Sequence, residues 1–175
     1  MLAGFKSKNH PQQVAARGAD DSVDTRVTPH RLWLQWHREF GFTLDAAANA
    51  KNAKCEKFYD LSTNGLVQAW DGENVWCNPP FSDLPIWVRK CLDETTYGRC
   101  PLVVMLLPAN RTEQRWWQNW IEPNRDRGIG VETRFLPHRI NFASEENPDG
   151  KSKSSAPFGC VLLILRNLNV TGRLR

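Results

Sequence analysis

The feature that most restricts the fold of this chain is an unbroken apolar run, Leu-Val-Val-Met-Leu-Leu, at residues 102–107. Because no polar residue alternates along it, the run is typical of a strand buried on both faces, as strands of parallel sheets are. A second apolar run at residues 160–165 predicts a last buried strand. We expect that strand to pair antiparallel with the strand before it in the chain. Both runs therefore predict strands of a sheet that is covered on both faces.

Shorter strands and helices are expected to alternate along the rest of the chain. The strands are predicted at residues 42–45, 57–60, 75–77 and 134–142, the last one broken by Pro137. The helices are predicted from Thr28, from Ser82 or Asp83, and over about residues 112–121. Strands that alternate with helices are typical of an α/β fold. We therefore expect an α/β sheet with helices on both faces and an antiparallel hairpin at its C-terminal end.

The first two predicted helices carry signals for where they begin and what they bury. Thr28 is expected to be the N-cap of the first helix, with Pro29 at its first helical position and Gly41 as its stop. The second helix has apolar residues at helical spacing. Its expected core residues are Ile86, Trp87, Val88, Cys91 and Leu92.

Length and charge limit the domain organisation and the class of partner. At 175 residues the chain is long enough for one domain with a substantial core. Residues 1–26 mix polar residues and glycine without periodicity, so we expect a flexible N-terminal arm and then a single domain over residues 27–175. Lys and Arg number 23 against 19 for Asp and Glu, a net charge of +4. This mildly basic balance is compatible with a polyanionic partner without requiring one.

Cysteine, histidine and hydrophobic patterning exclude several classes of protein. The 5 cysteines show no Cys-x-x-Cys spacing, and the 4 histidines are scattered. We therefore expect neither a disulfide framework nor a metal site. No apolar stretch reaches the roughly 18 residues of a membrane span, and no apolar signal core opens the chain. The sequence predicts a cytoplasmic protein, monomeric or weakly dimeric.

The stretch richest in chemistry is Asn78-Pro79-Pro80-Phe81, which closes the predicted strand at residues 75–77. Each proline fixes its own φ and holds the residue before it extended, so the strand ends in a rigid turn. Asn78 Oδ1 and the Pro79 carbonyl can accept the two protons of an exocyclic amine, while Phe81 stacks on the ring that bears the amine. In the alternative interpretation the prolines only end a strand and Phe81 only fills the core.

Acidic side chains are expected at two further strand ends. Asp45 closes the strand at residues 42–45, where open α/β sheets place cofactor contacts. The small Ala46 follows it and lets a ligand approach the backbone. Asp60 ends the next strand and can bind a ribose, although it follows Asp45 by fewer residues than is usual for that role. The alternative role for Asp45 is to cap the next helix.

With these pieces placed, the chain resembles the phage-type DNA adenine-N6 methyltransferases, the small Dam-like enzymes of bacteriophages and prophages. The segments that carry the resemblance are Thr28-Pro29, Phe42 to Ala47, Gly65-Leu66 with Trp70, Asn78 to Phe81 with Trp87, Leu106 to Ala109, Arg134 to Arg139 with Phe142, and Ala156 to Gly159. The glycine-rich donor loop of many methyltransferases is missing, and residues 44–48 take its place. Phe81 stands where such enzymes more often have tyrosine.

The resemblance implies S-adenosylmethionine as the methyl donor, bound on a Rossmann-like methyltransferase sheet, and adenine in double-stranded DNA as the acceptor. We expect catalysis from Asn78, Pro79, Pro80 and Phe81, and contacts to the methyl donor from Thr28, Pro29, Asp45, Ala46 and Asp60. The same turn can grip either amine, so methylation of cytosine N4 stays open. Two further hypotheses also stay open, namely methylation of a protein glutamine amide and an inactive nucleic-acid-binding module.

Contacts to DNA are expected from loops around the catalytic strand end, because so short a chain has no room for a separate recognition domain. The candidates are Arg111, Arg115, Arg139, Lys151 and Lys153. Arginine can contact guanine edges or phosphates, while the lysines, in a long polar loop at residues 143–157, are expected to act as phosphate charges. In the alternative, Arg111 and Arg115 belong to a solvated helix face and pair with Glu113 or Glu122.

Overall fold

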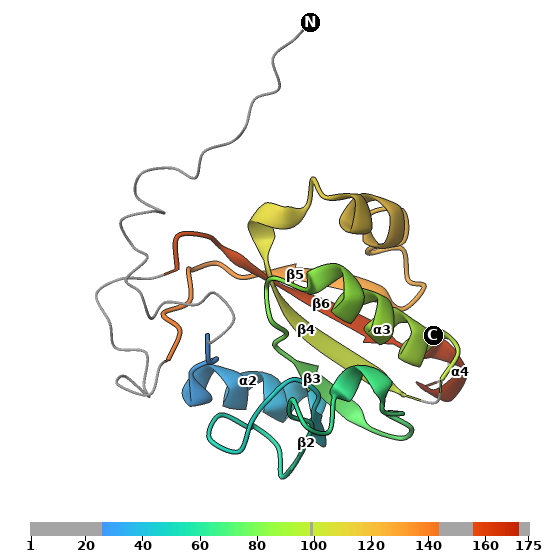
Figure 1. Ribbon diagram of the computed structural model, residues 1–175. Coiled ribbons are helices and arrows are strands. Elements are labelled where there is room, and N and C mark those ends of the chain that lie inside the picture. The colour runs from blue at the N-terminus through green and yellow to red at the C-terminus, as the bar shows by residue number, and fades with distance from the viewer. Residues whose placement is uncertain (1–25, 99, 144–155, 172–175) are drawn as a thin grey trace, which may run out of the picture.

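The computed structural model describes residues 26–98, 100–143 and 156–171, and in them strands and helices alternate around one sheet (Figure 1). The sheet has six strands in the order β2-β1-β3-β4-β6-β5. The strands are β1 Leu44–Asp45, β2 Lys57–Phe58, β3 Asn74–Cys77, β4 Leu102–Pro108, β5 Val131–Phe135 and β6 Cys160–Arg166. The helical segments are α2 His30–Phe40, η1 Gly65–Val67, α3 Leu84–Thr96, η2 Ala109–Arg111, η3 Trp117–Ile121 and α4 Leu168–Thr171.

Strand direction brings most of the strand ends to one edge of the sheet. β1 pairs in parallel with β2 and β3, and β3 pairs in parallel with β4. β6 is antiparallel to both β4 and β5, so β5 runs in the same direction as β4. The carboxyl ends of β1 to β5 therefore lie at one edge, which we call the carboxyl edge. The predicted α/β sheet and its antiparallel C-terminal hairpin, β5 with β6, are confirmed.

The sheet is covered on both faces because its central strands alternate between two cores. In β4, Val103, Met105 and Leu107 belong to the core that α3 covers. Leu102, Val104 and Leu106 belong to the core on the opposite face, which α2 covers through Trp33, Trp36 and Phe40. Every residue of β4 is buried, as the unbroken apolar run predicts.

Both long helices form near the predicted positions, with two corrections. The N-cap of α2 is Pro29 and not Thr28, because the first helical N–H groups, those of Leu32 and Trp33, donate to the Pro29 carbonyl at 3.1 and 3.0 Å. Gly41 ends the helix at φ 62°, as predicted. In α3 the prediction that Ile86 lies in the core is wrong, since its side chain is 58% exposed.

The prediction of one helix over residues 112–121 is wrong in the type of helix. A 3₁₀ turn over Ala109–Arg111 comes first, and a π-helical turn over Trp117–Ile121 follows. Trp116 and Trp117 are both buried. The π-turn is closed by the Glu122 N–H, which donates to the Trp117 carbonyl at 2.9 Å.

The strand predicted at residues 134–142 is shorter and begins earlier. β5 runs over Val131–Phe135, and the Leu136 N–H adds a bond to the Cys160 carbonyl at 2.9 Å. Pro137 has no N–H with which to continue the ladder. Farther on, Ala143 forms an isolated antiparallel bridge with Val27.

The remaining predictions concern disulfides, metal sites and membrane spans, together with the N-terminal arm and the long polar loop. All five cysteines are free thiols, and four of them are buried. In residues 26–98, 100–143 and 156–171, no helix is long and apolar enough to cross a membrane and no cluster of possible metal ligands is found. The predicted arm at residues 1–26 and the predicted loop at residues 143–157 lie outside the described residues, except for their end residues.

Candidate active site

Asn78 follows β3 at the carboxyl edge, and only one of the two polar atoms of its side-chain amide has a hydrogen-bond partner among the described residues. Its Nδ2 donates to the carbonyl of Arg26 at 2.7 Å. Its Oδ1 is buried and accepts no hydrogen bond from any residue that the structure describes. A buried polar atom without a partner is costly. The N–H group of a ligand at this edge would satisfy the Asn78 oxygen.

The rest of the turn is rigid and packed as the prolines predict. Pro79 is buried, and the Pro80 carbonyl accepts the N–H of Asp83 at 3.2 Å, which leads the chain into α3. Phe81 is 9% exposed and lies edge-on to Phe142 and Phe158, with ring centroids 6.2 and 5.9 Å away. The predicted strand end is thus backed by an aromatic cluster.

Three segments that are distant in the sequence complete this cluster. The guanidinium of Arg26 lies 4.9 Å from the centroid of the Phe158 ring and 5.8 Å from that of Phe142. The neighbouring Val27 is tied to Ala143 by two backbone hydrogen bonds, of 3.3 and 2.8 Å. The sequence predicted Arg26 as the last residue of a flexible arm, without a role in the site, and the hydrogen bond of its carbonyl to Asn78 corrects that for this residue. Phe142 was predicted as the end of a strand, and it and Phe158 lie in segments that carry the family resemblance, which was the available signal.

Asp45 lies at the end of β1, next to the end of β3, but both oxygens of its carboxylate already accept hydrogen bonds. The side chain is 3% exposed. One oxygen accepts the Lys54 N–H at 3.0 Å and the other the Ala47 N–H at 3.4 Å. Burial raises the pKa of Asp45 to about 6, and the two backbone N–H groups hold it from rising further. Residues 46–56 form no helix, so the carboxylate supports a loop rather than a helix end.

The loop after β1 is held against the sheet by a glycine from another segment. Ala46 is fully buried, and its N–H donates to the Trp76 carbonyl of β3 at 2.9 Å. A Cβ added to Gly65 would lie 2.3 Å from the Ala46 carbonyl oxygen, so only glycine fits there. Trp70 Nε1 in turn donates to the Gly65 carbonyl at 3.1 Å. Gly65 thus supplies a close backbone approach next to a loop that lacks glycine itself.

The other residues predicted to contact a methyl donor differ in whether their polar side chains already have hydrogen-bond partners. Thr28 is 1% exposed, and its buried hydroxyl has no hydrogen-bond partner among the described residues. Thr28 and Pro29 lie near the carboxyl edge because Arg26, two residues earlier, is bonded to Asn78. Asp60 accepts hydrogen bonds from Ser62 and Thr63, which lower its pKa to about 2. Asp60 therefore organises a tight turn after β2 and stays ionised.

The arginines predicted to contact DNA are exposed and lie beyond the same edge. Arg111 and Arg115 follow β4, and Arg139 follows β5. Within the part of the chain that the structure describes, no ion pair joins Arg111 or Arg115 to Glu113 or Glu122, and Glu122 instead pairs with Arg125 at 2.8 Å. The alternative of acid-paired arginines is therefore not realised. Lys151 and Lys153 lie outside the described residues.

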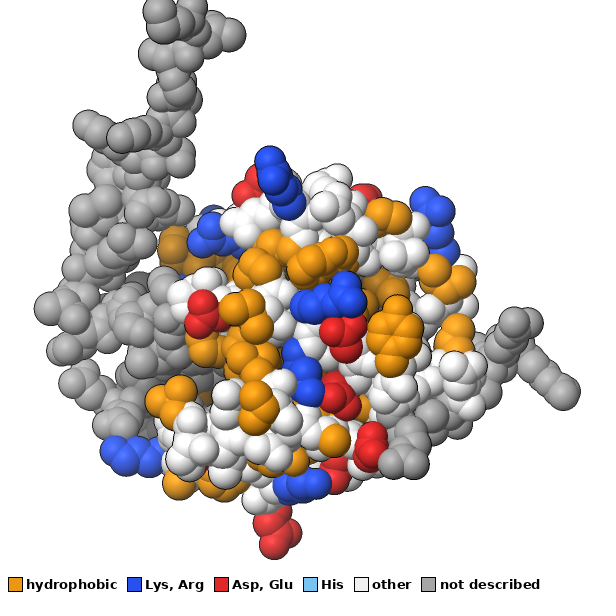
Figure 2. Space-filling view, turned by 45° about the vertical axis from the view of Figure 1, so that its right-hand side comes forward, with side chains coloured by type: hydrophobic (Ala, Val, Ile, Leu, Met, Phe, Trp, Pro, Cys, Tyr) orange, Lys and Arg blue, Asp and Glu red, His pale blue; other side chains and the backbone are white. Residues whose placement is uncertain are grey.

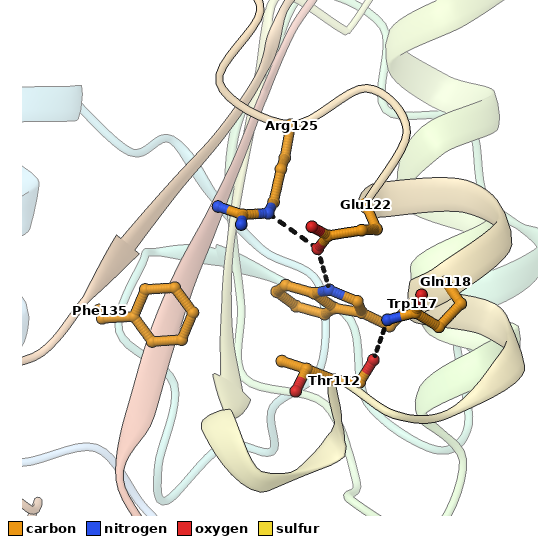
Figure 3. A pocket seen from close by; sticks show the side chains of 6 residues that line it. All are labelled: Thr112, Trp117, Gln118, Glu122, Arg125 and Phe135. Atoms are coloured by element: carbon orange, nitrogen blue, oxygen red, sulfur yellow. Dashed lines mark hydrogen bonds and ion pairs between the residues drawn. The ribbon is translucent and has the colours of Figure 1, made fainter.

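A pocket of about 340 Å³ opens between the segment after β4 and the end of β5 (Figure 3). Glu122 accepts hydrogen bonds from Trp117 Nε1 at 3.0 Å and Arg125 Nε at 2.8 Å on one side of it. Phe135, 52% exposed, faces the pocket from the other side. The surface view in Figure 2 shows acidic and basic side chains interleaved on the face drawn, with apolar groups between them.

Comparisons with known proteins show the family of the chain. A family model described as DNA N-6-adenine-methyltransferase (Dam) matches residues 16–173. The chain is 32% identical over 176 residues to a DNA N-6-adenine-methyltransferase of Escherichia phage T1, which covers 94% of this chain and 68% of the relative. It is 26% identical over 128 residues to a DNA N-6-adenine-methyltransferase of Haemophilus phage HP1, covering 69% of this chain and 72% of the relative.

Proposed function

The chain belongs to the Dam family of DNA N-6-adenine-methyltransferases, and we propose that it transfers a methyl group from S-adenosylmethionine to the N6 amine of adenine in double-stranded DNA at the turn Asn78–Phe81. Membership of this family supports the proposed reaction. The proposed position of the active site rests on the Oδ1 of Asn78, which is buried without a partner in the described residues and provides an acceptor for an amine proton at the carboxyl edge.

Asn78 and Pro79 act on the target amine by accepting its protons. The lone pair of adenine N6 is shared with the ring, so the free amine is a poor nucleophile. Hydrogen bonds from its two protons to Asn78 Oδ1 and to the Pro79 carbonyl pull the nitrogen toward tetrahedral geometry and localise the lone pair. Holding the amine in line with the methyl group supplies much of the acceleration. The nitrogen gains a bond to the methyl carbon while the bond from that carbon to the donor sulfur breaks, the electron pair stays on sulfur as a neutral thioether, and the nitrogen releases one proton to solvent.

The residues at the end of β1 and before α2 suit the methyl donor. Methyltransferases of this kind generally use S-adenosylmethionine, which when bound supplies a methyl group on a positively charged sulfur. We assign Asp45, Ala46 and Asp60, with Thr28 and Pro29, to holding it. Two observations support the fit: the buried Thr28 hydroxyl accepts and donates no bond among the described residues, and both Asp45 oxygens keep lone pairs beyond those that the loop uses.

The adenine must leave the duplex to reach Asn78, which costs a few kcal/mol. Stacking on Phe81 returns about 1–3 kcal/mol, and contacts to phosphates supply the rest. We assign those contacts to Arg111, Arg115 and Arg139, and to Lys151 and Lys153. The adjacent Cys77 takes no part, because burial raises the pKa of its thiol well above the usual range and direct transfer needs no covalent intermediate.

Nucleoside analysis tests the proposed function directly. Purified protein is incubated with tritiated S-adenosylmethionine and, separately, with unmethylated DNA, RNA or protein. We expect label only in DNA, and only in N6-methyladenine after digestion. Label in N4-methylcytosine or in glutamine would identify a different acceptor, and no label in any substrate would point to an inactive module.

A further inference from the structure

The amide of Asn78 can be turned in two ways, and only one of them suits the reaction. With Nδ2 toward Arg26, the 2.7 Å contact is a hydrogen bond to the Arg26 carbonyl, and Oδ1 faces away from it. With the amide turned over, two oxygen atoms would stand at that distance, and the amine protons of a substrate would meet an NH₂ group. The Arg26 carbonyl therefore selects the orientation in which Oδ1 is the free acceptor.

The Arg26 carbonyl is itself held from two directions. Along the chain, the antiparallel bridge between Val27 and Ala143 fixes the residue that follows it. Through its side chain, the guanidinium is placed over Phe158 and Phe142, at 4.9 and 5.8 Å from the ring centroids. Contacts of this kind between a cation and an aromatic face are attractive. The same two rings contact Phe81 edge-on, so one cluster joins Arg26 to the catalytic turn.

We propose that Arg26 is a positioning residue for methyl transfer: its carbonyl locks the Asn78 amide with Oδ1 toward the target amine, and its guanidinium, seated on Phe158 and Phe142, holds that carbonyl in place. This inference rests on the proposed function of Asn78. Arg26 touches neither substrate in this role, and it acts through the orientation of one amide.

Steady-state kinetics of Arg26 variants of the full chain test the role. Arg26→Ala removes the guanidinium that lies over the rings of Phe158 and Phe142. Arg26→Gly removes it too and also makes the backbone at this position more flexible. We expect kcat at saturating DNA to fall by about 10-fold for Ala and up to about 100-fold for Gly, because loss of fine positioning has effects of this size. Arg26→Lys keeps a cation over the rings and should recover part of the rate. The dissociation constant for S-adenosylmethionine should stay within about two-fold of the wild-type value.

A matched control and a second readout separate positioning from general damage. Arg38→Ala, which removes an exposed arginine of α2, should leave kcat unchanged. By nitrogen-15 NMR, the side-chain NH₂ of Asn78, identified by its absence in Asn78→Ser, should exchange slowly in the wild type and faster in Arg26→Ala and Arg26→Gly. This signal needs no turnover, so it reports on Arg26 even if the wild type proves to methylate another acceptor.

Two outcomes would overturn the inference. The first is an unchanged kcat in both Arg26→Ala and Arg26→Gly. The second is a loss confined to KM for DNA with the Asn78 NH₂ signal unmoved, which would make Arg26 a contact to DNA. A lowered kcat together with a faster-exchanging Asn78 amide supports it.

Discussion

The ends of β1 and β3 lie next to each other and carry similar polar side chains, yet they are built differently. The two strands are parallel neighbours, with Asp45 paired to Trp76. At the end of β1, both oxygens of Asp45 accept backbone N–H groups of the loop that follows. At the end of β3, Asn78 Oδ1 is buried with no partner in the described residues. The oxygen at the end of β3 is thus left without a partner in the described residues, whereas the carboxylate at the end of β1 already shares its oxygens with its own loop.

The difference follows from what comes after each strand. After Asp45 the chain is rich in alanine and asparagine and turns back, so that the N–H of Lys54 reaches the carboxylate. After Asn78 two prolines offer no N–H and hold the backbone extended. The prolines therefore donate no backbone hydrogen bond to the Asn78 oxygen, while the loop after β1 donates two to Asp45.

The sharpest test of this contrast is Asn78→Ala, for which we expect the largest effect. Turnover should fall by about 10²- to 10⁴-fold, because Asn78 acts mostly on the reacting amine. Binding of S-adenosylmethionine should stay within a few-fold, as measured by calorimetry. Thermal stability should hardly change, since the variant removes an unsatisfied oxygen along with one hydrogen bond. Near-normal methylation would remove Asn78 from catalysis.

Asp45→Ala should show the opposite pattern. We expect S-adenosylmethionine affinity to fall by about 10- to 100-fold, while kcat at saturating methyl donor falls less, because the effect is on binding. Stability should also drop, since the N–H groups of Ala47 and Lys54 lose their acceptor. If calorimetry found unchanged affinity in a folded Asp45→Ala protein, Asp45 would be a loop support alone.

The raised pKa of Asp45 makes the contrast visible in stability against pH. Burial raises this pKa from 3.8 to about 6 in the folded chain, so between these values the folded state binds more protons than the unfolded state. The stability from this group is therefore present below about pH 4 and is lost as pH rises through about 6, a change of roughly 3 kcal/mol. Urea unfolding across this range should show that slope in the wild type and its loss in Asp45→Asn. Equal slopes in both proteins would contradict the assignment.

Gly65→Ala should disturb the β1 end without touching Asn78. The new Cβ would meet the Ala46 carbonyl oxygen at 2.3 Å, so we expect a loss of about 1–3 kcal/mol in unfolding free energy, with weaker binding of the methyl donor. Gly159→Ala is the matched control, because its Cβ would lie 3.9 Å from its nearest neighbour, Ala109. If both variants had the same free energy of unfolding, the close approach of Gly65 to Ala46 would not contribute to stability.

The smallest effect is expected at the arginines beyond the carboxyl edge. In Arg111→Ala with Arg115→Ala, contacts to phosphates predict weaker binding to all DNA sequences and a salt dependence shallower by up to about two units. Arg89→Ala, an exposed arginine of α3 that pairs with Asp93 at 3.0 Å, is the control and should leave the slope unchanged. Fluorescence titrations across salt concentrations measure both. An unchanged slope in the double variant would place the duplex elsewhere.

The sheet could be predicted because its signals are local. The run at residues 102–107 and the two prolines after Asn78 fix a strand and a turn whatever surrounds them. The π-turn at Trp117–Ile121 could not be predicted, because helix propensity and apolar spacing do not distinguish a single π-turn from a turn of α-helix.

The site shows the same division between local and long-range causes. Asn78 and Asp45 could be proposed as site residues because strand ends can be recognised in the sequence. Arg26, Phe142 and Phe158 meet at the turn only through the bridge between Val27 and Ala143 and the packing of distant segments. No spacing or periodicity in the sequence predicts a contact of that kind. The N-cap at Pro29 rather than Thr28 is a similar case, since Thr28 is drawn into the interior.

The place of β6 between β4 and β5 has a consequence for how the chain is made. β5 emerges from the ribosome before β6, but the strand order gives it no neighbour other than β6. Until residues 160–166 are synthesised, β4 presents an unpaired apolar edge of the kind that recruits other chains. Completion of the sheet is then a late, long-range event, and such events are slow. Nascent chains stalled before β6 are therefore the species most exposed to aggregation and to proteases.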